Sequence, residues 1–301
     1  MQKIIITADD YGMCDVVDTA INAGIENGII TTTNVMTNME SLHNAKDLRE
    51  RYPDISVGIH WNVTTGKPVL SPDKIPTLVN GNDFYSLSEF KKRYSKGLID
   101  SRDLEKELEA QYILFEQTCG KPDYWNTHEN SSLHLKAFKI FEKVAKKYDV
   151  KATRNFQRVY YDKQGLGLKR EIREFLVKSF FNVWFNHIKK SFVMPTARIV
   201  SFNKISKTSG DVLLEALKKD GRDYIEVVFH PATTAESPYF GNISTERVKE
   251  YEFVSSHEIY EKYVANGFSF VNYESISYLY HNRGQHNENS YLKRIVMYRR
   301  Y

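Results

Sequence analysis

Short apolar runs alternate along the chain with longer segments in which apolar residues return every three or four positions. The first run, residues 3–8, is rich in isoleucine and typical of a strand buried on both faces. Val17, Ile21 and Ile25 then recur at four-residue intervals, which predicts an amphipathic helix that ends near Gly28. The same alternation predicts further strands at residues 29–36, 55–60, 124–128, 150–156, 224–230 and 268–273, and further helices at 42–51, 101–115, 135–147, 212–217 and 248–264.

Strands that are separated by helices predict an α/β architecture with a parallel sheet. About seven such units favour a closed or nearly closed barrel over an open sheet. Two segments break the rhythm and are expected to be loop insertions near the substrate, at residues 66–97 and 156–204. We therefore expect a single domain over residues 1–280, followed by a basic, tyrosine-rich extension at 281–301.

Charge and composition exclude several functional classes. The formal net charge is only +4, from 42 basic and 38 acidic residues, so no strong field points to nucleic acid. Cys14 and Cys119 are isolated, which argues against a zinc knuckle or a disulfide framework. No signal-peptide layout and no membrane-length apolar stretch is present, so we expect a cytoplasmic protein that binds neither nucleic acid nor membrane.

Polar side chains stand where the predicted strands end: Asp9, Asp10, His60, His128 and His230. In a parallel barrel these strand ends face one common mouth, so residues far apart in sequence should converge. One carboxylate and two imidazoles are a plausible ligand set for a divalent ion, which leaves a second carboxylate and a third histidine for proton transfer. Alone, each residue has a simpler interpretation as a turn, cap or packing residue, but the coincidence at one face favours a site.

Five segments, read in order, resemble the YdjC-like carbohydrate deacetylases, whose best-known members act on acetylated chito-oligosaccharides such as diacetylchitobiose. They are TADDYG, NGIITTTNVM, VGIHWNVTTGKPV, KPDYWNTHEN and EVVFHPA, at residues 7–12, 27–36, 57–69, 121–130 and 226–232. The resemblance implies a distorted (β/α) barrel related to polysaccharide deacetylases, often a homodimer, with one divalent metal ion, magnesium or zinc.

Carried over by position, the resemblance assigns a role to individual residues. Asp10, His60 and His128 resemble the metal ligands, Asp9 resembles the general base, and His230 resembles the proposed acid. Arg154 resembles a basic residue near the mouth that contacts substrate. The expected reaction is hydrolysis of the acetamide of an N-acetylated amino sugar or short oligosaccharide, which releases acetate and a free amine.

One departure lies in the third motif, where the family commonly has Asp-Ser-His-x-His-x-His. The ungapped alignment puts Asn126 in place of the carboxylate and keeps His128 as the ligand. Asn126 can accept a hydrogen bond beside a ligand, but it brings no charge. A shifted register would instead place His134 in the histidine row and Ser132 at the ligand position; we prefer the ungapped one because it keeps a histidine ligand.

Aromatic residues near the mouth have two equally open interpretations. Trp61 and Trp125, and with them Phe84 or Tyr85, could stack on sugar rings or simply pack in the core. Two other functions also stay open: a glycoside hydrolase on a barrel fold, and a metal-containing sugar-binding protein without turnover. The adjacency of Asp9 and Asp10 argues against the glycoside hydrolase, whose two carboxylates flank the scissile bond.

Overall fold

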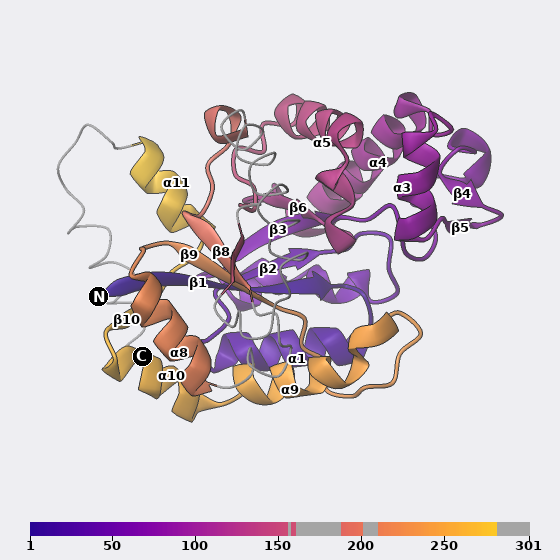
Figure 1. Ribbon diagram of the computed structural model, residues 1–301. Coiled ribbons are helices and arrows are strands. Elements are labelled where there is room, and N and C mark those ends of the chain that lie inside the picture. Colours follow the sequence, from indigo (N-terminus) through magenta and orange to yellow (C-terminus); the bar gives the residue numbers. More distant parts are fainter. Residues whose placement is uncertain (156–157, 161–187, 201–209, 282–301) are drawn as a thin grey trace, which may run out of the picture.

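A parallel sheet organises the computed structural model, which describes residues 1–155, 158–160, 188–200 and 210–281 (Figure 1). Its strands follow the order β6-β3-β2-β1-β9-β8-β7, and β10 pairs with β1 beside this path. Every pairing within this sheet is parallel. The strands are β1 (Gln2–Tyr11), β2 (Thr32–Val35), β3 (Ser56–Trp61), β6 (Trp125–Thr127), β7 (Arg158–Tyr160), β8 (Ala197–Val200), β9 (Ile225–Phe229) and β10 (Phe268–Phe270).

The sheet curls into a barrel whose closure is irregular. Two isolated parallel bridges, Trp125 with Thr153 and Ala152 with Val193, continue the pairing beyond β6. The second bridge lies on the segment that leads into β8, and β8 pairs with β9 beside β1. The pairing thus runs from β6 through these bridges to β8, β9 and β1, and from β1 through β2 and β3 back to β6. This confirms the expected α/β fold with a distorted barrel.

Helices cover the outside of the sheet, and α1 and α9 lie side by side on the face opposite α4 and α5 (Figure 1). The helices are α1 (Asp15–Glu26), α2 (Leu48–Arg51), α3 (Leu87–Ser95), α4 (Ser101–Cys119), α5 (Leu135–Lys147), α8 (Gly210–Asp220), α9 (Ser244–Val254), α10 (His257–Ala265) and α11 (Tyr273–His281). Short 3-10 turns are η1 (Leu42–Ala45), η2 (Pro72–Lys74), η3 (His128–Leu133) and η4 (Gly241–Ile243). In the described part of the chain, no helix is long and apolar enough to span a bilayer.

An aromatic cluster forms the core between the sheet and helices α4 and α5. The ring of Trp61 lies 5.4 Å from that of Trp125 and 5.8 Å from that of Phe141, measured between centroids. All three side chains are fully buried. Truncating such a ring to alanine typically costs about 3–5 kcal/mol of stability. The cluster therefore anchors β3 and β6, which carry Trp61 and Trp125.

Several expectations about local structure need correction. The helix predicted at 248–264 is two helices, because Ser256 interrupts it and caps α10 by accepting a hydrogen bond from the Ile259 N–H at 3.4 Å. The cap of α4 is Asp100 rather than Ser101, since its carboxylate accepts from the Arg102 N–H at 2.8 Å.

The predicted loop at 66–97 is partly ordered into secondary structure. It contains the hairpin β4 (Val79–Asn80) and β5 (Asp83–Phe84), and then α3, whose buried Phe90 and Tyr94 hold it against the core. Of the insertion expected at 156–204, only residues 158–160 and 188–200 are described, and they include β7 and β8 of the main sheet. Apart from His281, which ends α11, the extension at 281–301 lies outside the described residues.

Candidate active site and metal centre

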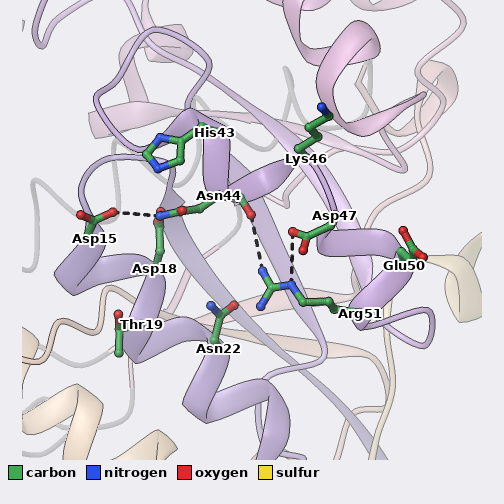
Figure 2. A pocket seen from close by; sticks show the side chains of 10 residues that line it. All are labelled: Asp15, Asp18, Thr19, Asn22, His43, Asn44, Lys46, Asp47, Glu50 and Arg51. Atoms are coloured by element: carbon green, nitrogen blue, oxygen red, sulfur yellow. Dashed lines mark hydrogen bonds and ion pairs between the residues drawn. The ribbon is translucent and has the colours of Figure 1, made fainter.

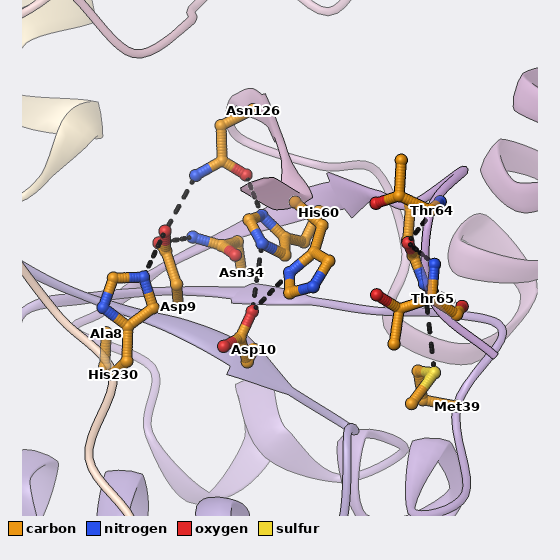
Figure 3. Close-up of polar contacts among 12 residues, drawn as sticks. Ala8, Asp9, Asp10, Asn34, Met39, His60, Thr64, Thr65, Asn126 and His230 are labelled. Carbon is orange, nitrogen blue, oxygen red and sulfur yellow. Dashed lines mark hydrogen bonds and ion pairs between the residues drawn. The ribbon is translucent and has the colours of Figure 1, made fainter. Parts of the chain in front are cut away.

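Two neighbouring aspartates of β1 point into the same region of the barrel mouth (Figure 3). In a regular strand, side chains of consecutive residues face opposite sides. Here the register of β1 against β2 shifts between Ala8 and Tyr11, and Asp10 has a φ of 76°. This left-handed conformation is unfavourable for a non-glycine residue, by about 1–3 kcal/mol. The irregularity turns Asp10 to the side that Asp9 already faces, so both aspartates reach the mouth where we expected them from the sequence.

Asp10, His60 and His128 form the candidate metal centre. Asp10 Oδ1 lies 3.2 Å from His60 Nε2 and 3.0 Å from His128 Nδ1. One donor atom from each residue lies within 4.8 Å of the other two, and all three side chains are buried. A carboxylate oxygen with two imidazole nitrogens is a donor set suited to a divalent cation, and it leaves coordination positions for water and substrate. The residues predicted as ligands are thus brought together.

Arg247 of α9 binds the second oxygen of Asp10. Its Nη2 lies 2.6 Å from Asp10 Oδ2, its Nη1 donates to the His230 carbonyl at 3.4 Å, and its guanidinium stacks on Phe240 at 4.6 Å. Burial alone would raise the pKa of Asp10, but Arg247 and the two histidines outweigh it and hold this pKa well below the usual range. Asp10 is therefore an anion with one oxygen engaged and the other directed at the histidines.

His128 is presented by an unusual backbone. It begins η3, and the next two residues, Glu129 and Asn130, have φ values of 51° and 53° in the left-handed region. Burial alone would lower the pKa of His128, but the Asp10 carboxylate more than offsets this, so the pKa is raised. The tight turn ends β6 immediately before the ligand, which explains why the predicted strand at 124–128 stops one residue early.

Asp9 lies beside this centre in a separate network of hydrogen bonds. Arg154 binds both of its oxygens at 2.6 Å, and the Asn34 amide donates to Oδ1 at 2.6 Å. Glu226 accepts from Arg154 Nε at 3.1 Å on the other side. Burial alone would raise the pKa of Asp9, but the Arg154 charge and hydrogen bonds outweigh it, so the pKa is strongly lowered. Asp9 is fixed as an anion.

Arg154 does not lie where we expected it. The resemblance implied that it contacts substrate, but it is only 3% exposed and its donors bind Asp9 and Glu226. Arg154 therefore holds the carboxylate of Asp9 in place, and its buried guanidinium does not face a ligand at the mouth.

His230 is the accessible member of the group. It directly follows β9, and its side chain is 33% exposed. Its Nε2 lies 3.6 Å from Asp9 Oδ2, and its backbone N–H donates to the Glu250 carboxylate. The imidazole can therefore contact both Asp9 and a molecule that enters from solvent.

Asn126 lies against His60, one of the three candidate ligands. Its side-chain amide lies between His60 Nδ1, the ring nitrogen that faces away from Asp10, and the group formed by Asp9, Arg154 and Asn34. A hydrogen bond to the outer nitrogen of a ligand histidine fixes the ring and selects its tautomer.

The tryptophans belong to the core and do not line the mouth. Trp61 and Trp125 are 0% exposed, and Trp61 Nε1 donates to the Leu108 carbonyl at 3.1 Å. Core packing, one of the two open interpretations, is therefore the one that the structure supports. Phe84 is buried as well, whereas Tyr85 is half-buried with the Arg93 guanidinium 4.3 Å from its ring.

Sequence reasoning missed three charged or polar residues around the aspartates. Arg247 lies on a helix, where a lone arginine carries no signal. Glu226 is a lone carboxylate inside an apolar strand and the first residue of the segment EVVFHPA, which were the available signals. Asn34 stands near the end of β2, within a segment of the resemblance, and could have been added by the same strand-end argument that found His60.

Comparison with known proteins gives consistent matches. The carbohydrate deacetylase of Halalkalibacterium halodurans is 28% identical over 155 residues, 52% of this chain and 65% of its own length. The carbohydrate deacetylase of Geobacillus stearothermophilus is 32% identical over 146 residues, 48% of this chain and 56% of its own length. The matched segments thus span less than two thirds of these relatives.

One solved structure shares the fold over nearly the whole chain. It is the crystal structure of an Enterococcus faecalis V583 protein described as a cellobiose-phosphate cleavage protein, with a TM-score of 0.69 and 23% identity. The likeness covers 91% of this chain and 98% of that one. The model of the YdjC-like protein family matches residues 3–265, which is most of the sequence, so the chain belongs to the YdjC-like family.

Proposed function

We propose that this chain is a metal-dependent carbohydrate deacetylase, which hydrolyses the acetamide of an N-acetylated amino sugar or short oligosaccharide. The observation that carries the proposal is the convergence of Asp10, His60 and His128 on one point, with an independent pair, Asp9 and His230, directly beside it. A ligand set next to a separate acid and base is what metal-assisted amide hydrolysis requires. The curated relatives named carbohydrate deacetylase support the same reaction.

Asp10, His60 and His128 would hold the ion. When bound, a divalent cation polarises the acetyl carbonyl and lowers the pKa of a water molecule. The two imidazole donors favour zinc or another transition ion over magnesium, which prefers oxygen ligands. Metal analysis of the purified protein tests this choice, and a magnesium-only preparation with full activity would contradict it.

Asp9 is suited to receive the proton of the attacking water. Arg154 and Asn34 fix its carboxylate, and its lowered pKa keeps it ionised at any physiological pH. The same lowered pKa makes Asp9 a weak base. Asp9 can therefore take a proton only from a water whose own pKa is lowered. Its proposed role thus depends on the ion that Asp10, His60 and His128 would hold beside it.

His230 is suited to protonate the leaving nitrogen. Its partly exposed imidazole lies 3.6 Å from Asp9. A proton that Asp9 takes from the water is therefore close to His230, which must deliver a proton to the leaving nitrogen. Overall, the water oxygen bonds to the acetyl carbon, the carbon–nitrogen bond breaks, and the nitrogen gains the proton. The products are acetate and a free amine.

The test is an acetate-release assay on N-acetylglucosamine and diacetylchitobiose, with a parallel assay for new reducing ends. We expect acetate from at least one substrate, no new reducing ends, and loss of acetate release in His60→Gln. His257→Gln is the matched control, because His257 is an exposed histidine on α10. Reducing ends without acetate would establish a glycoside hydrolase, and binding without either product would establish a sugar-binding protein.

A further inference from the structure

The loop after β3, residues 62–70, lies at the same end of the sheet as the candidate metal centre. β3 ends at Trp61, one residue after His60, and the carboxyl ends of parallel strands share one face of a barrel. The loop contains no helix or strand, so its backbone polar groups need other partners. Side chains from two other parts of the fold supply several of them.

Asn62 holds the backbone of Thr65 from both sides. Its Oδ1 accepts from the N–H groups of Thr64 and Thr65, both at 3.1 Å, and its Nδ2 donates to the Thr65 carbonyl at 2.7 Å. Asn38, which follows β2, donates from Nδ2 to the carbonyls of Thr65 at 3.2 Å and Lys67 at 2.8 Å. Asparagine side chains therefore bind both the N–H and the carbonyl of Thr65.

Two buried residues of α4 anchor both ends of this loop. Gln111 accepts from the Asn62 N–H at 3.0 Å, and it donates to the Asn62 carbonyl at 2.6 Å and to Glu107 at 2.8 Å. The Glu107 carboxylate accepts from the N–H groups of Val69 at 2.9 Å and Leu70 at 3.0 Å. Gln111 and Glu107 are both 0% exposed. Because a satisfied buried network makes the segment that it holds rigid, the loop is arranged before any ligand binds.

Thr65 is the residue that this network presents at the mouth. Figure 3 shows its side chain directed toward Asp10 and His60. Thr65 is half-buried, whereas its neighbour Thr64 is buried. Among the described residues, every hydrogen bond of Thr65 involves its backbone, so its hydroxyl is free to bind a ligand. A hydroxyl both donates and accepts, which suits the hydroxyl and acetamide groups of an N-acetylated sugar.

We propose that the Thr65 hydroxyl binds a hydroxyl or acetamide group of the sugar at the candidate active site, and that Asn62, Gln111 and Glu107 position it. This inference rests on the proposed function for the choice of sugar. A group on a rigid loop loses little entropy on binding, so its hydrogen bond contributes to affinity. The network runs between α4, this loop and the segment after β2, apart from the candidate metal ligands. A change at Thr65 should therefore weaken substrate binding and leave metal content unchanged.

Thr65→Val tests the hydroxyl, because valine keeps the shape of the side chain and removes the hydrogen bond. We expect KM for diacetylchitobiose in acetate release to rise about 3- to 10-fold, with kcat within about twofold of wild type. Thr65→Ser keeps the hydroxyl and should have a KM near that of wild type. Thr19→Val is the matched control, since Thr19 is an exposed threonine of α1. Calorimetric titration with diacetylchitobiose measures the same ratio as Kd and needs no turnover.

Glu107→Gln tests the positioning role. It keeps the size of the side chain but removes the charge that accepts from Val69 and Leu70. If Glu107 acts through Thr65, the two changes should not add, and Thr65→Val should weaken binding by less than about twofold in the Glu107→Gln protein. A residue that only stabilises the fold would leave the full effect of Thr65→Val in place. If Glu107→Gln fails to fold, Thr65→Val and Thr65→Ser still decide the role of the hydroxyl.

The outcomes separate this inference from the proposed reaction. Equal KM and Kd in wild type and Thr65→Val would overturn the inference, and acetate release by the same proteins would leave the deacetylase proposal in place. Weaker binding of diacetylchitobiose by Thr65→Val, in a protein that releases no acetate, would uphold the inference and remove the deacetylase proposal. A wild-type protein that neither binds nor deacetylates this sugar would remove both.

Discussion

The candidate metal centre and the hollow between α1, η1 and α2 are both rich in carboxylates, yet they offer very different chemistry. The hollow has a volume of about 760 Å³, which is in the range of small-molecule sites. Figure 2 shows its lining, which is Asp15, Asp18, Thr19, Asn22, His43, Asn44, Lys46, Asp47, Glu50 and Arg51. Composition and size alone would rank it as a candidate site.

The difference lies in what surrounds the buried aspartate of each region. Burial raises the pKa of both Asp10 and Asp18. At Asp10, Arg247 and the histidines reverse this effect and the pKa falls well below its usual range. At Asp18, hydrogen bonds from Asn44 and the Gly12 N–H do not reverse it, and the pKa rises to about 6. Arg247 and the two histidines around Asp10, which Asp18 lacks, therefore distinguish the candidate metal centre from the acidic hollow.

The largest expected effect is that of Asp10→Asn. The amide keeps the shape but loses the charge that a cation needs, so acetate release should fall by more than the roughly 100-fold typical of an outer partner. Metal content, measured by mass spectrometry, should fall with it. Asp18→Asn is the matched control in the hollow and should retain wild-type acetate release and metal content. An Asp10→Asn protein with wild-type metal content would erase the contrast between the two regions.

Arg247→Met should have the next largest effect. It leaves Asp10 buried without its cation, which typically costs about 3–5 kcal/mol of stability. Metal affinity or activity should drop by about 10- to 100-fold, as for other groups that orient a ligand. Arg247→Lys should recover part of the lost stability and part of the lost metal affinity or activity. Arg49→Met is the control, since the Arg49–Asp123 ion pair is half-exposed and away from the site; equal losses in both variants would mean that Arg247 acts only through stability.

Asp18→Asn should change how stability depends on pH. A carboxyl whose folded pKa is about 6, above its unfolded value of 3.8, binds more protons in the folded state between these values. Wild-type stability should therefore fall as pH rises from 4 to 7, by up to about 3 kcal/mol relative to Asp18→Asn. Denaturant unfolding at several pH values measures the slope. Parallel curves for the two proteins would contradict the raised pKa.

Asp47→Asn should have the smallest effect. Asp47 pairs with Arg51 at 3.2 Å on the exposed rim of the hollow, one turn away on the chain. Such pairs contribute little, so the free energy of unfolding should change by no more than about 0.5 kcal/mol. Acetate release should equal that of wild type. A clear loss of activity would show that the hollow takes part in the reaction.

The sequence predicted most of the strands and the convergence of the candidate ligands because both leave local signals. It missed β7 and β8, which lie in the expected insertion at 156–204, and the expected strand at 150–156 forms only isolated bridges. Asp10, His60 and His128 each follow an apolar run, and parallel strands bring such ends together. The same alternation of side chains along a strand could have predicted that Trp61 packs in the core and does not stack on sugar rings. Since His60 faces the barrel mouth, its neighbour Trp61 must face the helices outside.

Other features depend on contacts between distant segments and could not be predicted. Arg247 meets Asp10 across 237 positions of sequence, and nothing on α9 marks it. The left-handed backbone at Asp10 follows from the pairing of β1 with β2, not from the residue type. The break before α10 required the capping geometry of Ser256.

The bulge in β1 makes the two acids independently adjustable. Asp9 and Asp10 are neighbours in the chain, but Arg154 holds one and Arg247 of α9 holds the other. A substitution at either arginine can therefore retune one acid while the other keeps its own counter-ion. The pKa of Asp9 and the pKa of Asp10 therefore depend on different arginines, so selection or design can change one without the other.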